Sequence, residues 1–120
     1  MKRTGPTNPV TQELIRHLRE LARKQKVQLW ARLAEELERP SRKRRAVNIA
    51  TISRNSSPDE TVAVPGKVLS VGELEHPVTV AAYQFSRQAQ EKIIQKKGIC
   101  LELGELMKKN PQAKGVRILG

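Results

Sequence analysis

The chain has 120 residues, of which 23 are lysine or arginine and 12 are aspartate or glutamate, so its formal net charge is +11. Its length suffices for one modest hydrophobic core, and its 38% apolar residues exclude a fully disordered chain. No apolar run approaches the ~20 residues of a membrane-spanning helix, and the N-terminal residues lack the apolar region of a secretory signal. One cysteine excludes an internal disulfide and fits a reducing cytoplasmic compartment, while the excess of positive charge predicts a polyanionic partner.

The chain is predicted to begin with a basic tail and a helix. Residues 1–8 contain Lys2 and Arg3 beside glycine and proline, which indicates an extended tail. Pro9 suits a first helical position, and apolar spacing predicts a helix over residues 9–24. Cations on this helix alternate with glutamates at spacings that allow weak ion pairs, which favours a solvated surface. Its apolar stripe is predicted to consist of Val10, Leu14, Leu18, Leu21 and Ala22.

A second helix and a strongly basic run follow. A second apolar stripe that includes Trp30 predicts a helix over residues 28–38, which Pro40 ends. Residues 39–45 then hold five cations and no acid, a density at which like charges repel one another and disfavour packing on the core. Four of the five are arginines, whose planar fork binds phosphate oxygens bidentately. We therefore expect this run to bind phosphates through Arg39, Arg42, Lys43, Arg44 and Arg45 rather than to be a solvated surface.

The rest of the chain alternates between short strands and helices. Residues 46–52 fit either a strand or a short helix, and residues 61–64 fit a strand that Pro65 and Gly66 end in a turn. The elements expected after this turn are strands at 67–70 and 78–82, a helix at 87–97, a strand at 99–101, a short helix around 105–107 and a strand at 116–119. Alternation of strand and helix predicts parallel pairing with right-handed crossovers, hence an α/β body.

The helix over residues 87–97 carries the clearest local signals. Ser86 is its predicted N-cap, and Gly98 stands just beyond its last turn. Its apolar side is predicted to consist of Ala89, Ile93 and Ile94. The lysines of the helix are expected to face water: Lys92, Lys96 and Lys97.

No arrangement of catalytic groups or metal ligands is recognisable. Cys100 lies in an apolar run, which favours a small buried side chain over a reactive thiolate. His17 and His76 have no spacing that pairs them as ligands with each other or with Cys100. The Pro-Gly-Lys turn differs from a phosphate-binding P-loop, because Thr61 stands in place of the first glycine and Val68 in place of the serine or threonine that holds magnesium. We expect no enzyme, no cofactor, no metal and no small-molecule substrate.

Two further cations are predicted to contact nucleic acid. Lys67 follows the turn, which would project its ammonium group from a fixed backbone, although an ordinary exposed lysine is an equally good interpretation. Arg54 is the other candidate. The aromatic side chains Trp30, Tyr83 and Phe85 are all expected in the core, which disfavours base stacking and favours recognition of folded nucleic acid through phosphates and shape.

Several segments occur in the order found in one protein family. They are Thr4-Gly5-Pro6-Thr7-Asn8-Pro9, Arg39-Pro40 with the basic cluster and Val47-Asn48, Val64-Pro65-Gly66-Lys67-Val68-Leu69, Val78-Thr79-Val80-Ala81-Ala82 with Phe85-Ser86, and Asn110-Pro111 with Gly115-Val116-Arg117-Ile118. Together they resemble the L eighteen-e family of archaeal and eukaryotic large-subunit ribosomal proteins, related to bacterial large-subunit protein fifteen, over residues 3–119. The resemblance implies an α/β fold, a small body of short, mostly parallel strands and helices (an irregular ββα superhelix) with two N-terminal helices.

The resemblance also implies a structural role in the large ribosomal subunit, bound to large-subunit ribosomal RNA and beside neighbouring large-subunit ribosomal proteins. A single domain over residues 1–120 is expected, without membrane contact or homo-oligomer. Its parts are a basic tail at 1–8, a helical segment at 9–38, a basic RNA-binding segment at 39–45 and an α/β body at 46–120. The predicted RNA-binding residues are Lys2, Arg3, Arg39, Arg42, Lys43, Arg44, Arg45, Arg54 and Lys67. Composition alone leaves open a free-standing nucleic-acid-binding protein, such as a chromatin or RNA-processing factor.

Overall fold

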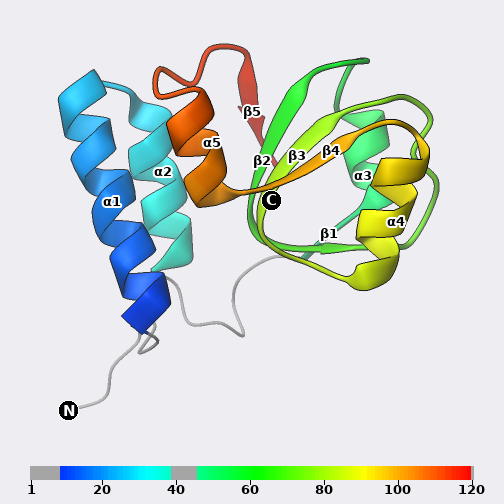
Figure 1. Ribbon diagram of the computed structural model, residues 1–120, viewed down its shortest axis with the longest axis horizontal. Coiled ribbons are helices and arrows are strands. Elements are labelled where there is room, and N and C mark those ends of the chain that lie inside the picture. The colour runs from blue at the N-terminus through cyan, green and yellow to red at the C-terminus, as the bar shows by residue number, and fades with distance from the viewer. Residues whose placement is uncertain (1–8, 39–45, 120) are drawn as a thin grey trace.

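The structure of the protein, a computed structural model, describes residues 9–38 and 46–119 as helices and short strands in alternation (Figure 1). The elements are α1 (Pro9–Gln25), α2 (Gln28–Leu37), β1 (Ala46–Asn48), α3 (Ile49–Arg54), β2 (Thr61–Leu69), β3 (Thr79–Phe85), α4 (Arg87–Gln95), β4 (Ile99–Glu102), α5 (Leu103–Lys109) and β5 (Val116–Ile118). This confirms the predicted α/β class with two N-terminal helices. Residues 46–52 were compatible with a strand or a helix, and they contain both, since β1 passes directly into α3.

The described strands form one sheet in which each pair is parallel. β3 lies along one side of β2, and β4 follows on the far side of β3. β1 and β5 share the other side of β2: β5 pairs with its first residues, Thr61–Ala63, and β1 with its last, Lys67–Leu69. The central strand β2 therefore ties the two ends of the α/β body together.

The predicted turn at Pro65 and Gly66 is wrong, because β2 runs through both residues without reversing. The register between β2 and β3 shifts between Val64 and Lys67, as a β-bulge does. A bulge accommodates proline, which lacks the N–H group that a regular ladder requires. Figure 1 shows β2 and β3 curving along their length, and the two strands expected on either side of the turn are one bent strand.

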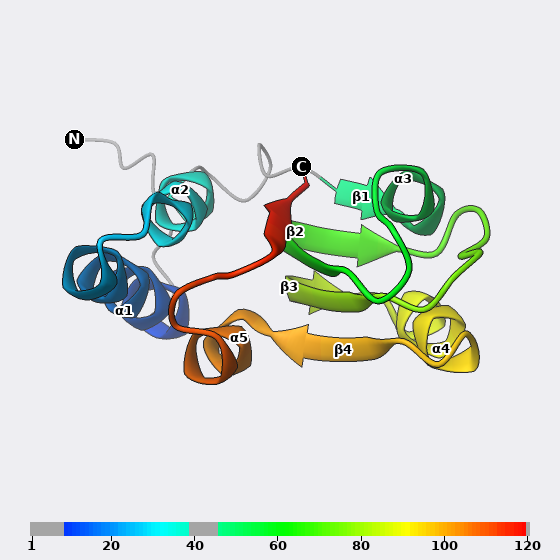
Figure 2. The ribbon, with the colours of Figure 1, turned by 90° about the horizontal axis from the view of Figure 1, so that it is seen from above.

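The sheet divides the apolar interior in two, whereas one core was expected. In Figure 2, α1, α2 and α5 lie at one side of the sheet and α3 and α4 at the other. Val62, Val64, Val68 and Val80 pack with α3 and α4, whereas residues of α1, α2 and α5 pack on Ala63 and Ala81. Burial on both faces explains why the strands read as runs of valine and alanine with little polar alternation.

The two N-terminal helices form an antiparallel pair, with Trp30 fully buried as predicted. Val10 is the one residue of the predicted stripe on α1 that does not pack on the core, and it is 75% exposed, whereas the other four do: Leu14, Leu18, Leu21 and Ala22. Thr11 occupies the inward position instead, where its hydroxyl is hydrogen-bonded to the hydroxyl of Tyr83. This polar contact explains why apolar spacing alone placed Val10, rather than Thr11, on the inward face.

α4 begins as predicted, since the Ser86 hydroxyl accepts a hydrogen bond from the backbone N–H of Ala89 at 3.1 Å. Two of its three predicted apolar positions, Ala89 and Ile93, are buried as expected, but the third, Ile94, is 62% exposed. Lys92 does not face open water, because its ammonium group donates to the carbonyl oxygens of Ser70 and Gly72 at 2.8 and 2.7 Å. This lysine fastens the loop after β2 to α4.

Candidate nucleic-acid interface

Two of the nine predicted RNA-binding residues, Arg54 and Lys67, lie in the part of the chain that the structure describes. The other seven lie outside the described residues: Lys2, Arg3, Arg39, Arg42, Lys43, Arg44 and Arg45.

Lys67 is an exposed residue on the second half of β2, directly after the bulge. β1 holds the strand on one side and β3 on the other, with Ala46 and Gln84 as the register partners of Lys67. Val68 next to it is fully buried, which fixes the direction in which Lys67 leaves the strand. Its ammonium group makes no hydrogen bond or ion pair with any described residue. The expected fixed backbone is therefore present, although a paired strand supplies it rather than a turn.

The register of β1 also shows where the basic run joins the sheet. Ala46 is the residue that follows Arg45 in the sequence, and its partner across the two strands is Lys67. Neighbouring strands lie about 4.8 Å apart, so the chain enters the sheet at Ala46 about one strand spacing from Lys67. Gln84 lies exposed on the third strand of the same row, and its amide can donate to phosphate or sugar oxygens. Sequence reasoning did not select Gln84, because strand register cannot be read from local pattern.

Arg54 lies at a different place from Lys67. It is the exposed last residue of α3. Ser53 beside it contacts the segment that leads into β3. The Ser53 hydroxyl accepts a hydrogen bond from the N–H of Glu75 at 3.1 Å, and the Ser53 carbonyl oxygen lies 3.2 Å from Nε2 of His76. Arg54 is therefore near the start of the parallel strands, whereas Lys67 is near their other end. The structure does not bring these two predicted residues together.

Some exposed cations of the protein form ion pairs with glutamates, whereas others have no acidic partner in the part of the chain that the structure describes and can bind a phosphate. Arg16 on α1 contacts Glu13 at 2.6 Å and Glu20 at 3.4 Å, as helical spacing predicted, and Arg19 pairs with Glu38. Arg54, like Lys67, has no such partner among the described residues. Exposed pairs contribute little to stability, but this compensation makes Arg16 and Arg19 poorer phosphate-binding groups than an uncompensated lysine.

The cysteine and the two histidines considered for catalysis or metal binding contact apolar side chains, backbone carbonyl oxygens or a neighbouring glutamate. Cys100 is half-buried against the apolar cluster of α3 and α4, and burial raises the pKa of its thiol. His76 has its two ring nitrogens at 3.2 Å from the carbonyl oxygens of Pro77 and Ser53, and His17 lies 3.5 Å from Glu13. Within residues 9–38 and 46–119, no three side chains of the metal-binding types gather in one place, and no helix is long and apolar enough to cross a membrane.

A model of the family described as ribosomal proteins 50S-L15, 50S-L18e and their 60S counterpart matches residues 15–101. The chain belongs to this family. The resemblance drawn from short segments is thereby confirmed, and the family is one of ribosomal structural components rather than enzymes.

Individual members of this ribosomal family resemble the chain over nearly its whole length. The large ribosomal subunit protein eL18 of Methanothermobacter thermautotrophicus is 44% identical over 119 residues, which cover 99% of this chain and 98% of that protein. The eL18 of Sulfurisphaera tokodaii is 44% identical over 117 residues, covering 98% and 96% of the two chains. The eL18 of Methanococcus maripaludis is 41% identical over 119 residues, covering 99% of both.

Proposed function

We propose that the chain is a structural constituent of the large ribosomal subunit in the cytoplasm, where it binds and stabilises folded large-subunit ribosomal RNA through phosphate contacts. The observation that carries this proposal is the similarity over nearly the full length to archaeal proteins named as large-subunit components. Neighbouring large-subunit proteins are its further partners. The net charge of +11 then serves to neutralise RNA phosphates.

The proposed interface centres on the point where residues 39–45 meet the sheet. Lys67 supplies an uncompensated cation on a backbone that two neighbouring strands hold in place, and Ala46 joins the basic run to the same row. A cation that is already held in position loses less conformational freedom when it meets a phosphate. The arginines of the run add bidentate contacts, and Lys2, Arg3 and Arg54 extend the interface to other parts of the RNA.

Salt-dependent binding tests this proposal. The purified chain is titrated with in vitro transcribed large-subunit ribosomal RNA from Methanothermobacter thermautotrophicus at several salt concentrations. Five phosphate contacts by residues 39–45 predict a slope of log K against log salt of about −4 to −5 from this run alone. Replacement of Arg42, Lys43, Arg44 and Arg45 by alanine is expected to weaken binding and to reduce the slope by about 3–4 units, with unchanged helical circular dichroism.

A matched control removes the same charge from helix surfaces, with alanine in place of Arg16, Arg19, Lys96 and Lys97. This control is expected to keep most of the slope. An equal loss in both variants would contradict a localised interface, because it would mean that net charge alone governs binding. Equally tight binding to an arbitrary DNA duplex would instead favour the free-standing nucleic-acid-binding protein.

A further inference from the structure

A second basic surface lies at the end of the molecule formed by the α1–α2 turn and the α5–β5 loop, here called the distal surface. Residues 23–28 and 108–115 contain six cations and no acid. The six side chains are exposed, and none of their charged groups has a hydrogen-bond or ion-pair partner among the described residues: Arg23, Lys24, Lys26, Lys108, Lys109 and Lys114. This combination of dense cations without acids is the same feature that singled out residues 39–45.

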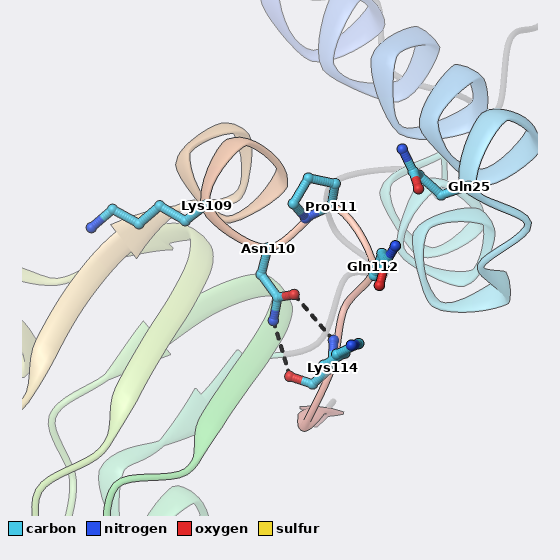
Figure 3. Close-up of a pocket in the computed structure, with 6 residues that line it drawn as sticks. All are labelled: Gln25, Lys109, Asn110, Pro111, Gln112 and Lys114. Carbon is cyan, nitrogen blue, oxygen red and sulfur yellow. Dashed lines mark hydrogen bonds between the residues drawn. The ribbon is translucent and has the colours of Figure 1, made fainter.

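The two segments meet around an open hollow of about 250 Å³ (Figure 3). Gln25 reaches from the end of α1 towards Pro111 and Gln112, while Lys109 and Lys114 line the side formed by the α5–β5 loop. The hollow is smaller and shallower than the pockets that enclose small molecules, so it suits one unit of a long polymer that lies across the surface. The amides of Gln25 and Gln112 can donate to phosphate or sugar oxygens there, whereas the Lys109 side chain extends away from these two residues (Figure 3).

The loop that carries these lysines is held in one conformation. The Asn110 side chain donates to the carbonyl oxygen of Lys114 at 3.0 Å and accepts from its backbone N–H at 3.2 Å. The buried indole N–H of Trp30 donates to the carbonyl oxygen of Pro111 at 2.7 Å, which fastens the loop to α2. The cations therefore leave a fixed backbone, and less freedom is lost when they bind.

Helix dipoles explain only part of this cluster. Cations in the last turn of a helix are stabilised by its negative end, and this accounts for Arg23 and Lys24 on α1 and for Lys108 and Lys109 on α5. Lys26 and Lys114 lie beyond the helix ends, Lys26 with a positive φ of 57°. Neither the dipole nor an acidic partner accounts for these two cations.

The distal surface is well separated from the places where the basic tail and the basic run join the body. α1 and α2 are antiparallel, so Pro9 and Glu38 lie at the end of the helical pair opposite the α1–α2 turn (Figure 1). α1 has 17 residues and is therefore about 25 Å long. This exceeds the Debye length of about 8 Å at physiological salt, so charges at the two ends interact only weakly with each other.

We propose that the distal surface binds the phosphate backbone of a second segment of ribosomal RNA, so that the protein bridges two segments that its opposite ends contact. This inference rests on the proposed function and adds a second contact surface to it. An acid-free row of lysines with flanking amides fits a nucleic-acid backbone better than a protein partner, because protein interfaces are depleted in lysine at their centres.

Binding to the same ribosomal RNA tests the inference with two variants of equal charge. The distal variant carries Lys26→Gln, Lys109→Gln and Lys114→Gln, and the control carries Arg87→Gln, Lys96→Gln and Lys97→Gln. Each set includes one lysine with a positive φ, Lys26 or Lys97, so backbone effects are matched. The distal variant is expected to reduce the salt slope by about 2–3 units and to weaken binding about a hundredfold to a thousandfold at 0.1 M salt, with little change in the control.

The outcomes separate the two proposals. Failure of the unmodified chain to bind ribosomal RNA would overturn the proposed function itself. If the variant of residues 42–45 has a reduced salt slope but the distal variant binds ribosomal RNA no more weakly than its control, the distal surface would be overturned and the proposed function would stand.

A photo-crosslinking residue at position 112, compared with one at position 84, gives a second readout in assembled large subunits. Crosslinks from both positions to separate stretches of ribosomal RNA would support the bridge. Crosslinks from position 112 to the same nucleotides as position 84, to a neighbouring protein or to nothing would overturn it.

Discussion

Gly98 joins α4 to β4, and its replacement by alanine is expected to destabilise the fold strongly. A Cβ atom at this position would lie 2.5 Å from the carbonyl oxygen of Val78, 2.8 Å from Cγ2 of Ile93 and 3.0 Å from the Ile93 carbonyl oxygen. Two of these three atoms belong to the backbone, so no side-chain rotation relieves the contact. The glycine is required for close approach, because the left-handed residue that ends the helix is Lys97, with φ 64°.

The size of the destabilisation by Gly98→Ala can be worked out from the hydrogen bonds that the new Cβ atom would disturb. Val78 accepts a hydrogen bond from the N–H of Ile99 at 3.1 Å, and Ile93 accepts one from Gly98 at 2.9 Å. Moving β4 away to relieve the contact weakens at least one such bond, at about 1 kcal/mol, and overpacking against Ile93 adds about 1–3 kcal/mol. The free energy of unfolding is thus expected to fall by about 2–4 kcal/mol, which lowers Tm by roughly 8–16 °C for a chain of this length.

Thermal unfolding followed by circular dichroism measures this effect, and Gly104 offers the matched control. Gly104 lies in α5, and a Cβ there meets nothing within 4 Å. Gly104→Ala is expected to raise stability by about 0.5 kcal/mol, or roughly 2 °C, through helix propensity. Equal Tm values for the two variants would refute the reasoning, because they would mean that the approach of β4 to β3 does not depend on the missing side chain.

Three further predictions concern single groups. Lys97→Gly should raise the free energy of unfolding by about 0.5–1 kcal/mol in denaturant titration, since glycine removes the left-handed strain at φ 64°. Cys100, whose thiol pKa is raised by burial, should react with an aromatic disulfide reagent more slowly in the folded protein than in guanidinium, and equal rates would contradict this. The Glu60 carboxylate accepts a hydrogen bond from the backbone N–H of Ser57 at 2.9 Å and pairs with Arg117, and both contacts lower the pKa of Glu60 below 4.5. The stability that the ionised Glu60 contributes is therefore present above pH 4.5 and is lost as the pH falls through the lowered pKa. Arg117→Gln should raise this pKa in a carbon-detected NMR titration.

Local signals in the sequence sufficed for most helices. Pro9 at the start of α1 and Ser86 before α4 act through neighbouring backbone groups, so their roles can be read from a few residues. The order of strand and helix after residue 78 likewise led to the parallel sheet. Arginine density at residues 39–45 needs no three-dimensional information to be recognised as a candidate phosphate-binding segment.

Features that depend on long-range contacts could not be predicted. Pro65 and Gly66 have the composition of a turn, and only the strands on both sides of β2 turn them into a bulge. Thr11 replaces Val10 on the inward face of α1 because of a hydroxyl 72 residues away on Tyr83. For the candidate interface, the pairing of Ala46 with Lys67 and the separation of Arg54 from both depend on strand register, which local pattern does not encode.

The central claim is that the chain is a large-subunit protein held on ribosomal RNA by phosphate contacts. Sucrose-gradient sedimentation of lysate from the cells that encode it, with the chain detected by mass spectrometry, tests this claim most directly. The account predicts that the chain sediments with the large-subunit peak at low and moderate salt and is released as salt rises further. Its absence from that peak at low and moderate salt would contradict the account.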